Sequence, residues 1–153
     1  MPATPLRLLS STELAAWRGF LRTHSELLRE LDAELRRAHD LPLTSYEVLL
    51  FLADAPEGRL RMSELADAVL LSRSGMSRLV DRLEAKGLLR REECEDDARG
   101  AFAVLSEPGR ELFDAARATH LAGVREHFLD RLSRQELERL GRLWEQVLPR
   151  PAS

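Results

Sequence analysis

The chain has a single cysteine, a single lysine, few aromatic residues and no isoleucine or asparagine among its 153 residues. One thiol, Cys94, excludes a disulfide within the chain and is typical of a reducing compartment. No apolar run is long enough to cross a bilayer, and the N-terminal segment lacks the apolar core of a signal peptide. We therefore expect a cytoplasmic protein without a membrane partner. The preference for arginine over lysine indicates a GC-rich bacterial genome.

The sequence also lacks the motifs that commonly mark an enzyme. It has no glycine-rich phosphate loop, no His-Glu-x-x-His pair and no nucleophile elbow. His120 and His127 share a helix face and, with Cys94 or Glu126, offer ligands for zinc. The four-residue histidine spacing usual for zinc on a helix is missing, however. We therefore predict no catalytic residues, no cofactor and no metal ligands.

A chain of this length forms one domain with a sizeable core. Its net charge of −3 argues against nonspecific attraction to nucleic acid. DNA binding would therefore require a local basic surface. Residues 73–91 provide one, because six cations face two carboxylates there: Arg73, Arg78, Arg82, Lys86, Arg90 and Arg91 against Asp81 and Glu84.

Residues 62–106 are typical of two short helices followed by a charged hairpin. Ser63 and Ser72 are expected N-caps, because apolar residues recur after each serine at three- and four-residue steps. Gly87 offers the left-handed conformation that commonly ends a helix. Alternating apolar residues on both sides of a polar segment then predict two antiparallel strands, with Asp97 and Arg99 near their tip. This order favours a helix-turn-helix that lays its second helix in a DNA major groove.

The second of these helices carries most of the predicted DNA contacts. Hydroxyls, guanidinium groups and the free amides of a helix N-terminus bind phosphate oxygens and base edges. Arg99 would enter a narrow minor groove, with its side chain held extended by Asp97. The remaining acidic residues of the hairpin are expected to face solvent or to pair with Arg90 and Arg91. The predicted DNA-binding residues are Ser72, Arg73, Ser74, Gly75, Ser77, Arg78, Arg82, Asp97 and Arg99.

Long amphipathic helices are predicted at both ends of the chain. Three helix starts are expected to form capping boxes: Ser10 with Glu13, Thr44 with Glu47, and Ser133 with Glu136. A fourth helix start is expected to be capped by the hydroxyl of Ser106. From Ser10 to about Asp40, apolar residues recur at a and d spacing and form a narrow seam. A domain this small does not readily bury so long a seam, so we expect the terminal helices to interlock with those of a second copy.

The segment SELADAVLLSRSGMSRLVDRLEAKGLLRR, with DARGAFAVLSEPGRE after the hairpin, resembles the winged helix-turn-helix of the MarR family of bacterial regulators. Its most specific parts are Asp97-x-Arg99, residues 78–83 and Gly87-Leu88. The resemblance extends in layout over nearly the whole chain and implies a mostly α fold with a small β-hairpin wing. It makes residues 1–153 a single MarR-like domain. Within that domain, dimerisation helices lie at about 10–40 and 107–148, and a winged helix-turn-helix lobe lies at about 44–105.

The resemblance also implies a homodimer that represses transcription and leaves its operator when a small ligand binds. Its two recognition helices would read a pseudo-palindrome of double-stranded DNA. Trp17, His24 and Tyr46 fall on helices that would wall the ligand crevice, and they suit an aromatic or phenolic compound. Core packing is the alternative for Trp17 and Tyr46. Two other functions stay open: a protein-interaction module that docks through its acidic wing without binding DNA, and a metal-responsive member of the family.

Overall fold

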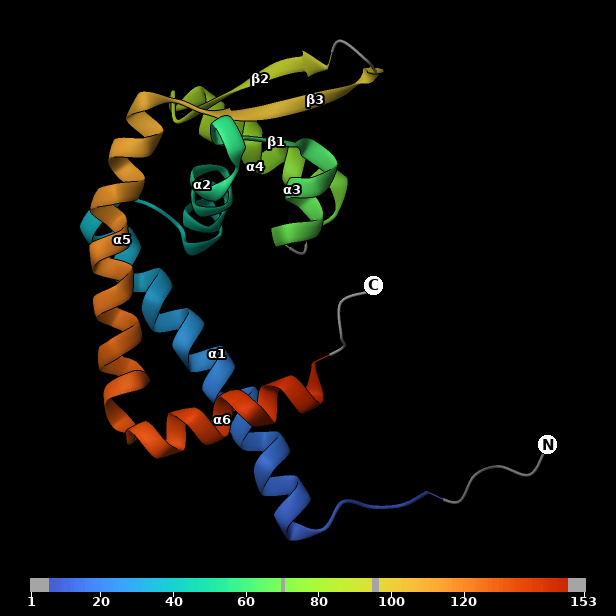
Figure 1. Cartoon of the computed structure of the whole chain (residues 1–153), viewed down its shortest axis with the longest axis vertical. Coiled ribbons are helices and arrows are strands. Elements are labelled where there is room, and N and C mark those ends of the chain that lie inside the picture. The colour runs from blue at the N-terminus through green and yellow to red at the C-terminus, as the bar shows by residue number, and fades with distance from the viewer. Residues whose placement is uncertain (1–5, 70, 95–96, 149–153) are drawn as a thin grey trace, which may run out of the picture.

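The computed structural model describes residues 6–69, 71–94 and 97–148. Within these ranges, Arg73 and residues 97–99 are described by their backbone alone. The elements run α1 (Ser11–His39), α2 (Leu43–Asp54), η1 (Pro56–Gly58), β1 (Arg59–Arg61), α3 (Met62–Val69), α4 (Arg73–Ala85), β2 (Leu89–Cys94), β3 (Asp97–Leu105), α5 (Glu107–His127), η2 (Leu129–Arg131) and α6 (Arg134–Val147). In Figure 1, α2, α3, α4 and the strands gather at one end, and α1, α5 and α6 extend away from them. The predicted fold class, mostly helical with a small β wing, is confirmed.

The small sheet has the strand order β1-β3-β2, with both neighbouring pairs antiparallel. The predicted hairpin corresponds to β2 and β3. The third strand, β1, was not predicted, because three residues are too few for an alternating pattern. β1 pairs with β3 from Arg59 opposite Val104 to Arg61 opposite Phe102. The guanidinium carbons of these two arginines lie 4.6 and 5.6 Å from the centre of the Phe102 ring, so cation–π contacts add to the pairing.

The central helix of the lobe is α2, in which six of the twelve residues are buried. Its buried residues point in several directions, which is typical of a helix covered on all sides. Val48, Leu49 and Leu52 are fully covered and belong to one continuous core with the inner faces of α1, α3, α4 and α5. Removing a side chain of this size from water contributes about 1.5–3 kcal/mol. The core therefore fixes how α4 is presented at the surface.

Most of the predicted helix caps are confirmed. Ser10 with Glu13 and Ser133 with Glu136 form complete capping boxes. The hydroxyl of Ser72 accepts a hydrogen bond from the amide of Gly75, and that of Ser106 accepts one from Gly109. Gly87 has a φ of 73° and lies directly after the cap of α4, as predicted.

Two predicted caps are wrong. Pro42, rather than Thr44, is the N-cap of α2, and the N-cap residue itself makes no side-chain hydrogen bond to the helix. The amide of Leu43 instead donates a hydrogen bond to Oδ1 of Asp32 on α1, at 2.9 Å, so a carboxylate from another helix satisfies the helix start. Similarly, α3 begins at Met62, before Ser63, and the carboxylate of Glu64 accepts from the amide of Arg61.

The start of α5 is fastened to the turn that follows α4. The Ser106 hydroxyl donates to the carbonyl of Gly87 at 2.6 Å, and the Ser106 amide donates to the carbonyl of Leu88 at 3.2 Å. One turn later, α5 passes so close to this turn that a Cβ on Gly109 would lie 1.9 Å from the Leu88 oxygen. The end of α4, the start of β2 and the start of α5 therefore form one joint.

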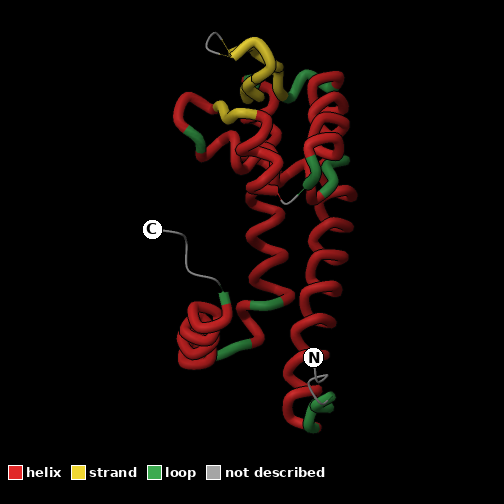
Figure 2. The backbone as a smooth tube through the Cα atoms, turned by 90° about the vertical axis from the view of Figure 1, so that its right-hand side faces the viewer, coloured by secondary structure: helices red, strands yellow, loops and turns green. Residues whose placement is uncertain are grey.

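At the opposite end, α1 and α5 run side by side and α6 turns back across α1 (Figures 1 and 2). Phe20 on α1 packs against Trp144 on α6, with ring centres 5.6 Å apart. The apolar seam of α1 is only partly covered, since Trp17, Leu21 and Leu28 are 53%, 45% and 39% exposed. Within the described residues, no helix combines the length and the apolar character needed to span a membrane.

Candidate nucleic-acid interface

The candidate recognition surface is the polar face of α4. Met76, Leu79, Val80 and Leu83 are buried and anchor this helix to the core. The opposite face leaves Ser72, Ser74, Arg78 and Arg82 exposed. The α4 N-terminus therefore presents the hydroxyls of Ser72 and Ser74 at the positive end of the helix dipole, which attracts anions. Arg78 near the middle of the helix and Arg82 in its last turn extend the positive charge along the same face.

Gly75 lies inside the first turn of α4. The Ser72 hydroxyl is 3.0 Å from the Gly75 amide, and a Cβ on residue 75 would lie 3.1 Å from the same oxygen. A glycine at this position therefore leaves room for the cap and keeps the backbone accessible.

Two of the predicted site residues lie on the wing. Asp97 begins β3, and Arg99 follows in the same strand. Their predicted contact with each other, like the predicted major-groove contact of the Arg73 side chain, lies outside the described residues.

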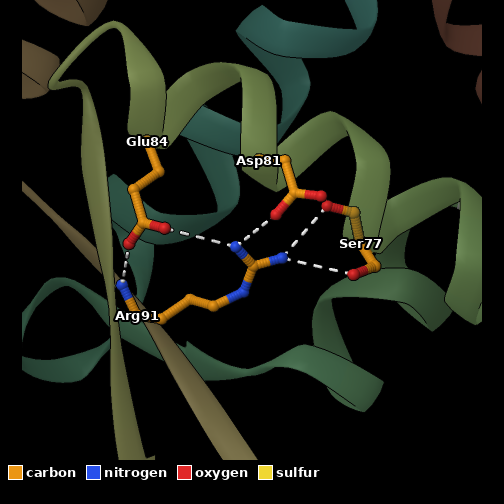
Figure 3. Close-up of polar contacts among 4 residues, drawn as sticks. All are labelled: Ser77, Asp81, Glu84 and Arg91. Atoms are coloured by element: carbon orange, nitrogen blue, oxygen red, sulfur yellow. Dashed lines mark hydrogen bonds and ion pairs between the residues drawn. The ribbon is translucent and has the colours of Figure 1, made fainter.

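Arg91 of β2 joins the wing to α4 (Figure 3). One terminal nitrogen of its guanidinium is 2.6 Å from Oδ1 of Asp81 and 3.3 Å from Oε1 of Glu84. The other donates to the carbonyl and the hydroxyl of Ser77, at 3.0 and 3.2 Å. The backbone amide of Arg91 donates to Oε2 of Glu84 at 2.7 Å. We call these contacts among Ser77, Asp81, Glu84 and Arg91 the Arg91 clamp.

The Arg91 clamp assigns Ser77 a second role. Ser77 was predicted to face the major groove, and the structure places it half-buried against the wing arginine. A hydroxyl that accepts one hydrogen bond can still donate one, so the two roles are compatible. The sequence did not predict the Arg91 clamp, because Arg91 is 7 to 14 positions away from its partners and lies on a different element.

The cations of this region are not equally available to a partner. Arg90 pairs with Glu92 at 2.8 Å, as predicted for the acidic residues of the hairpin, and Glu92 also lies 3.8 Å from Arg59. Arg91 pairs with α4 instead of the hairpin. Within the described part of the chain, the side chains of Arg78, Arg82 and Lys86 form no ion pair, and all three are exposed. The positive charge of the surface is therefore concentrated on α4.

The three predicted ligand residues lie in two separate places. Tyr46 is buried in the lobe against Phe113 and His120, with ring centres 5.6 and 4.6 Å away, and burial raises the pKa of its phenol. Trp17 packs against Phe20 on α1. His24 follows one turn after Phe20 and lines an apolar cavity of about 500 Å³ between α1 and α6. The structure thus brings Trp17 and His24 to one helix face and places Tyr46 elsewhere.

The histidines do not gather around Cys94. Cys94 is buried at the end of β2 in the wing, whereas His127 ends α5 at the far end of the molecule (Figure 1). Burial lowers the pKa of His120, although the charge of Glu34 acts in the opposite direction. Nδ1 of His120 is buried and has no hydrogen-bond partner among the described residues.

Comparison with known proteins decides the family. A sequence profile of the MarR family matches residues 39–100. The transcriptional regulator HosA of Escherichia coli O157:H7 is 34% identical over 106 residues, which cover 67% of this chain and 76% of HosA. The structure of AbsC, a MarR family transcriptional regulator from Streptomyces coelicolor, is 38% identical with a TM-score of 0.88, covering 93% of this chain and 95% of AbsC.

The chain belongs to the MarR family of transcriptional regulators. Membership confirms the resemblance found in residues 63–91 and 97–111 and the prediction that the protein is not an enzyme. Another solved MarR family structure, Sco3205 from Streptomyces coelicolor in complex with DNA, is 36% identical with a TM-score of 0.88, covering 94% of this chain and 89% of Sco3205.

Proposed function

We propose that this MarR family regulator is a homodimeric repressor that binds a pseudo-palindromic operator and is released by a small aromatic or phenolic ligand. One observation carries the DNA-binding part: the exposed face of α4 combines a helix N-terminus, two serine hydroxyls and the exposed arginines Arg78 and Arg82. The complex of the similar Sco3205 with DNA supports the same reading. In this proposal, Arg73, Ser74, Ser77 and Arg78 enter the major groove. Ser72 and Arg82 support contact with the phosphate backbone or hold the helix, and Gly75 leaves the α4 backbone uncovered. Arg99 enters the minor groove, and Asp97 holds its side chain extended.

The dimer is supported by the apolar surface that one chain leaves uncovered. The exposed side chains of Trp17, Leu21 and Leu28 form a stripe along α1, and those of Leu143, Trp144 and Val147 continue it on α6. An apolar surface of this extent marks an interaction site in a soluble protein. A second copy would cover it symmetrically and place two α4 helices about one DNA turn apart.

For the effector, we propose binding beside the aromatic residues of the helical base. His24 lines the apolar cavity between α1 and α6, with Phe20 and Trp144 nearby. An apolar cavity with a polar side chain in its wall, the imidazole of His24, suits an aromatic acid or a phenol. Tyr46 and His120 form a second aromatic contact between α2 and α5, so both places are candidates for ligand contact.

Mobility shift on the promoter of the chain's own gene tests DNA binding. We expect tight binding that weakens steeply between two salt concentrations, because phosphate contacts release counterions. Arg78→Ala should lose about 1–3 kcal/mol of binding free energy if Arg78 reads a base. Arg125→Ala, which removes an exposed arginine from α5, is the matched control and should bind like the wild type. Analytical ultracentrifugation tests the dimer, and release of DNA by a panel of aromatic acids and phenols tests the effector.

The rival function, a docking module that uses an acidic wing, predicts the opposite result. It requires wild type and Arg78→Ala to bind DNA equally weakly. The pairing of Glu92 with Arg90 and Arg59 argues against this rival, because part of the acidic surface is already neutralised within the chain.

A further inference from the structure

Two carboxylates and one imidazole meet between α1 and the last turn of α5, away from the DNA-reading surface. Oε1 of Glu34 lies 2.5 Å from Nε2 of His127, and these side chains are only 23% and 18% exposed. Glu126 completes the group, since one ligand atom from each of the three residues lies within 4.8 Å of the other two. The residues are 92 and 93 positions apart along the chain, so the packing of α1 against α5 alone creates the cluster.

The donor atoms and their spacing suit a divalent transition metal. Zinc binds imidazole nitrogen and carboxylate oxygen at about 2.0–2.2 Å, so that two ligands of a tetrahedral ion lie about 3.3 Å apart. The Glu34–His127 pair is closer than that value, at 2.5 Å, and the ligand atom of Glu126 lies no more than 4.8 Å from either partner. Three protein ligands would leave the fourth position of zinc to water.

The carboxylate of Glu34 lies against a glycine of α5, where the two helices approach closely. Gly123 lies one helical turn before His127, and a Cβ there would be 2.3 Å from Oε2 of Glu34 and 2.8 Å from Cδ2 of Leu31. The absence of a side chain at residue 123 lets the Glu34 carboxylate lie directly against α5. Beside the cluster, a cavity of about 530 Å³ that His127 and Glu30 help to line opens to solvent. An ion and its water ligand therefore have a path to the site.

We propose that Glu34, Glu126 and His127 bind one zinc ion per chain. An ion pair between Glu34 and His127 is the simpler interpretation, but it gives no role to Glu126, whose exposed carboxylate has no other polar contact within the described residues. Glu126 therefore separates the two interpretations. The site does not depend on DNA binding, so a failure of this inference and a failure of the proposed function are separate observations.

The test is titration of the purified full chain, first stripped of metal, with zinc in competition with a chromophoric chelator. We expect saturable binding of one zinc per chain and a rise of the melting temperature on zinc addition. Glu126→Gln should weaken zinc binding at least about 10-fold, since loss of even an outer-sphere partner costs 10- to 100-fold. Glu111→Gln, which removes an exposed glutamate from the same helix, is the matched control and should bind zinc like the wild type.

His127→Gln removes the imidazole but keeps an N–H donor for Glu34. We expect it to lose zinc binding while its circular dichroism stays native. If it does not fold, Glu126→Gln alone decides the result. Zinc binding of equal strength in wild type and Glu126→Gln, or no saturable binding by the wild type, would overturn the proposal and leave an ion pair between the helices.

Discussion

Replacing Arg91 by alanine removes the guanidinium group that joins the wing to α4. The guanidinium makes four contacts of 3.3 Å or less, with Asp81, Glu84 and the carbonyl and hydroxyl of Ser77. Hydrogen bonds to charged groups contribute about 1.5–3 kcal/mol each when buried, whereas exposed ion pairs contribute about 0.2–1 kcal/mol. Arg91 is 27% exposed and Asp81 is 63% exposed. Solvent therefore screens the ion pairs, and we expect Arg91→Ala to lower the free energy of unfolding by about 1–3 kcal/mol.

The same substitution should weaken operator binding without changing its dependence on salt. Arg91 is turned toward α4 and donates to protein acceptors, so it is a positioning residue rather than a phosphate contact. Loss of a phosphate contact reduces the slope of log affinity against log salt concentration by about one, whereas loss of orientation leaves that slope unchanged. Arg91→Lys should restore little, because an ammonium group cannot replace a planar fork.

The assay is a mobility-shift titration at four salt concentrations for wild type, Arg91→Ala, Arg91→Lys and Arg82→Ala. Arg82→Ala provides the reference for a surface cation on the same helix. If Arg91→Ala reduces the salt slope as much as Arg82→Ala does, Arg91 contacts DNA directly and the reasoning from the Arg91 clamp is refuted.

Three further predictions test other parts of the structure. Gly109→Ala should lower the free energy of unfolding by about 3 kcal/mol or more, measured by urea denaturation, because its Cβ would overlap the Leu88 carbonyl; an unchanged midpoint would contradict this close approach. Ser72→Ala should cost about 0.5–2 kcal/mol through loss of the α4 cap, whereas Ser74→Ala should change stability by less than about 0.5 kcal/mol. Burial lowers the pKa of His120 below its ordinary value of 6.5, so the unfolded chain binds its proton more readily and stability should fall as the pH drops below 6.5. His120→Phe should remove part of that loss in denaturation at pH 7.5 and 5.5, and an unchanged difference would show that His120 does not contribute.

The sequence predicted those elements whose signals are local. Ser10, Ser72, Ser106 and Ser133 cap helices because each bonds to an amide three residues away, and such a pattern is visible in a linear chain. The hairpin strands were recognisable from alternation, and Gly87 from its place after the last apolar residue of α4. These local signals place the polar face of α4 at the surface, which is most of the candidate site.

Contacts between distant residues had no such signature. The cap of α2 comes from Asp32 on another helix, and β1 is defined only by its pairing with β3. The Arg91 clamp, the contact of Tyr46 with His120 and the cluster around Glu34 depend on how helices and strands pack. Aromatic residues on amphipathic helices were therefore assigned to one crevice, although packing separates Tyr46 from Trp17 and His24.

The joint at Ser106 makes α5 a lever for the whole DNA-reading lobe. Because the Ser106 hydroxyl and amide hold the turn at Gly87 and Leu88, the recognition helix and the wing are both attached to the upper end of α5. A helix of 21 residues is about 31 Å long, so a tilt of about 5° at its lower end displaces the upper end by about 3 Å. In the proposed two-fold dimer the two displacements would add to about 6 Å, which is more than the rise of about 3.4 Å between neighbouring base pairs. In that dimer, a small rearrangement near α6 would therefore be sufficient to move both α4 helices out of register with their half-sites.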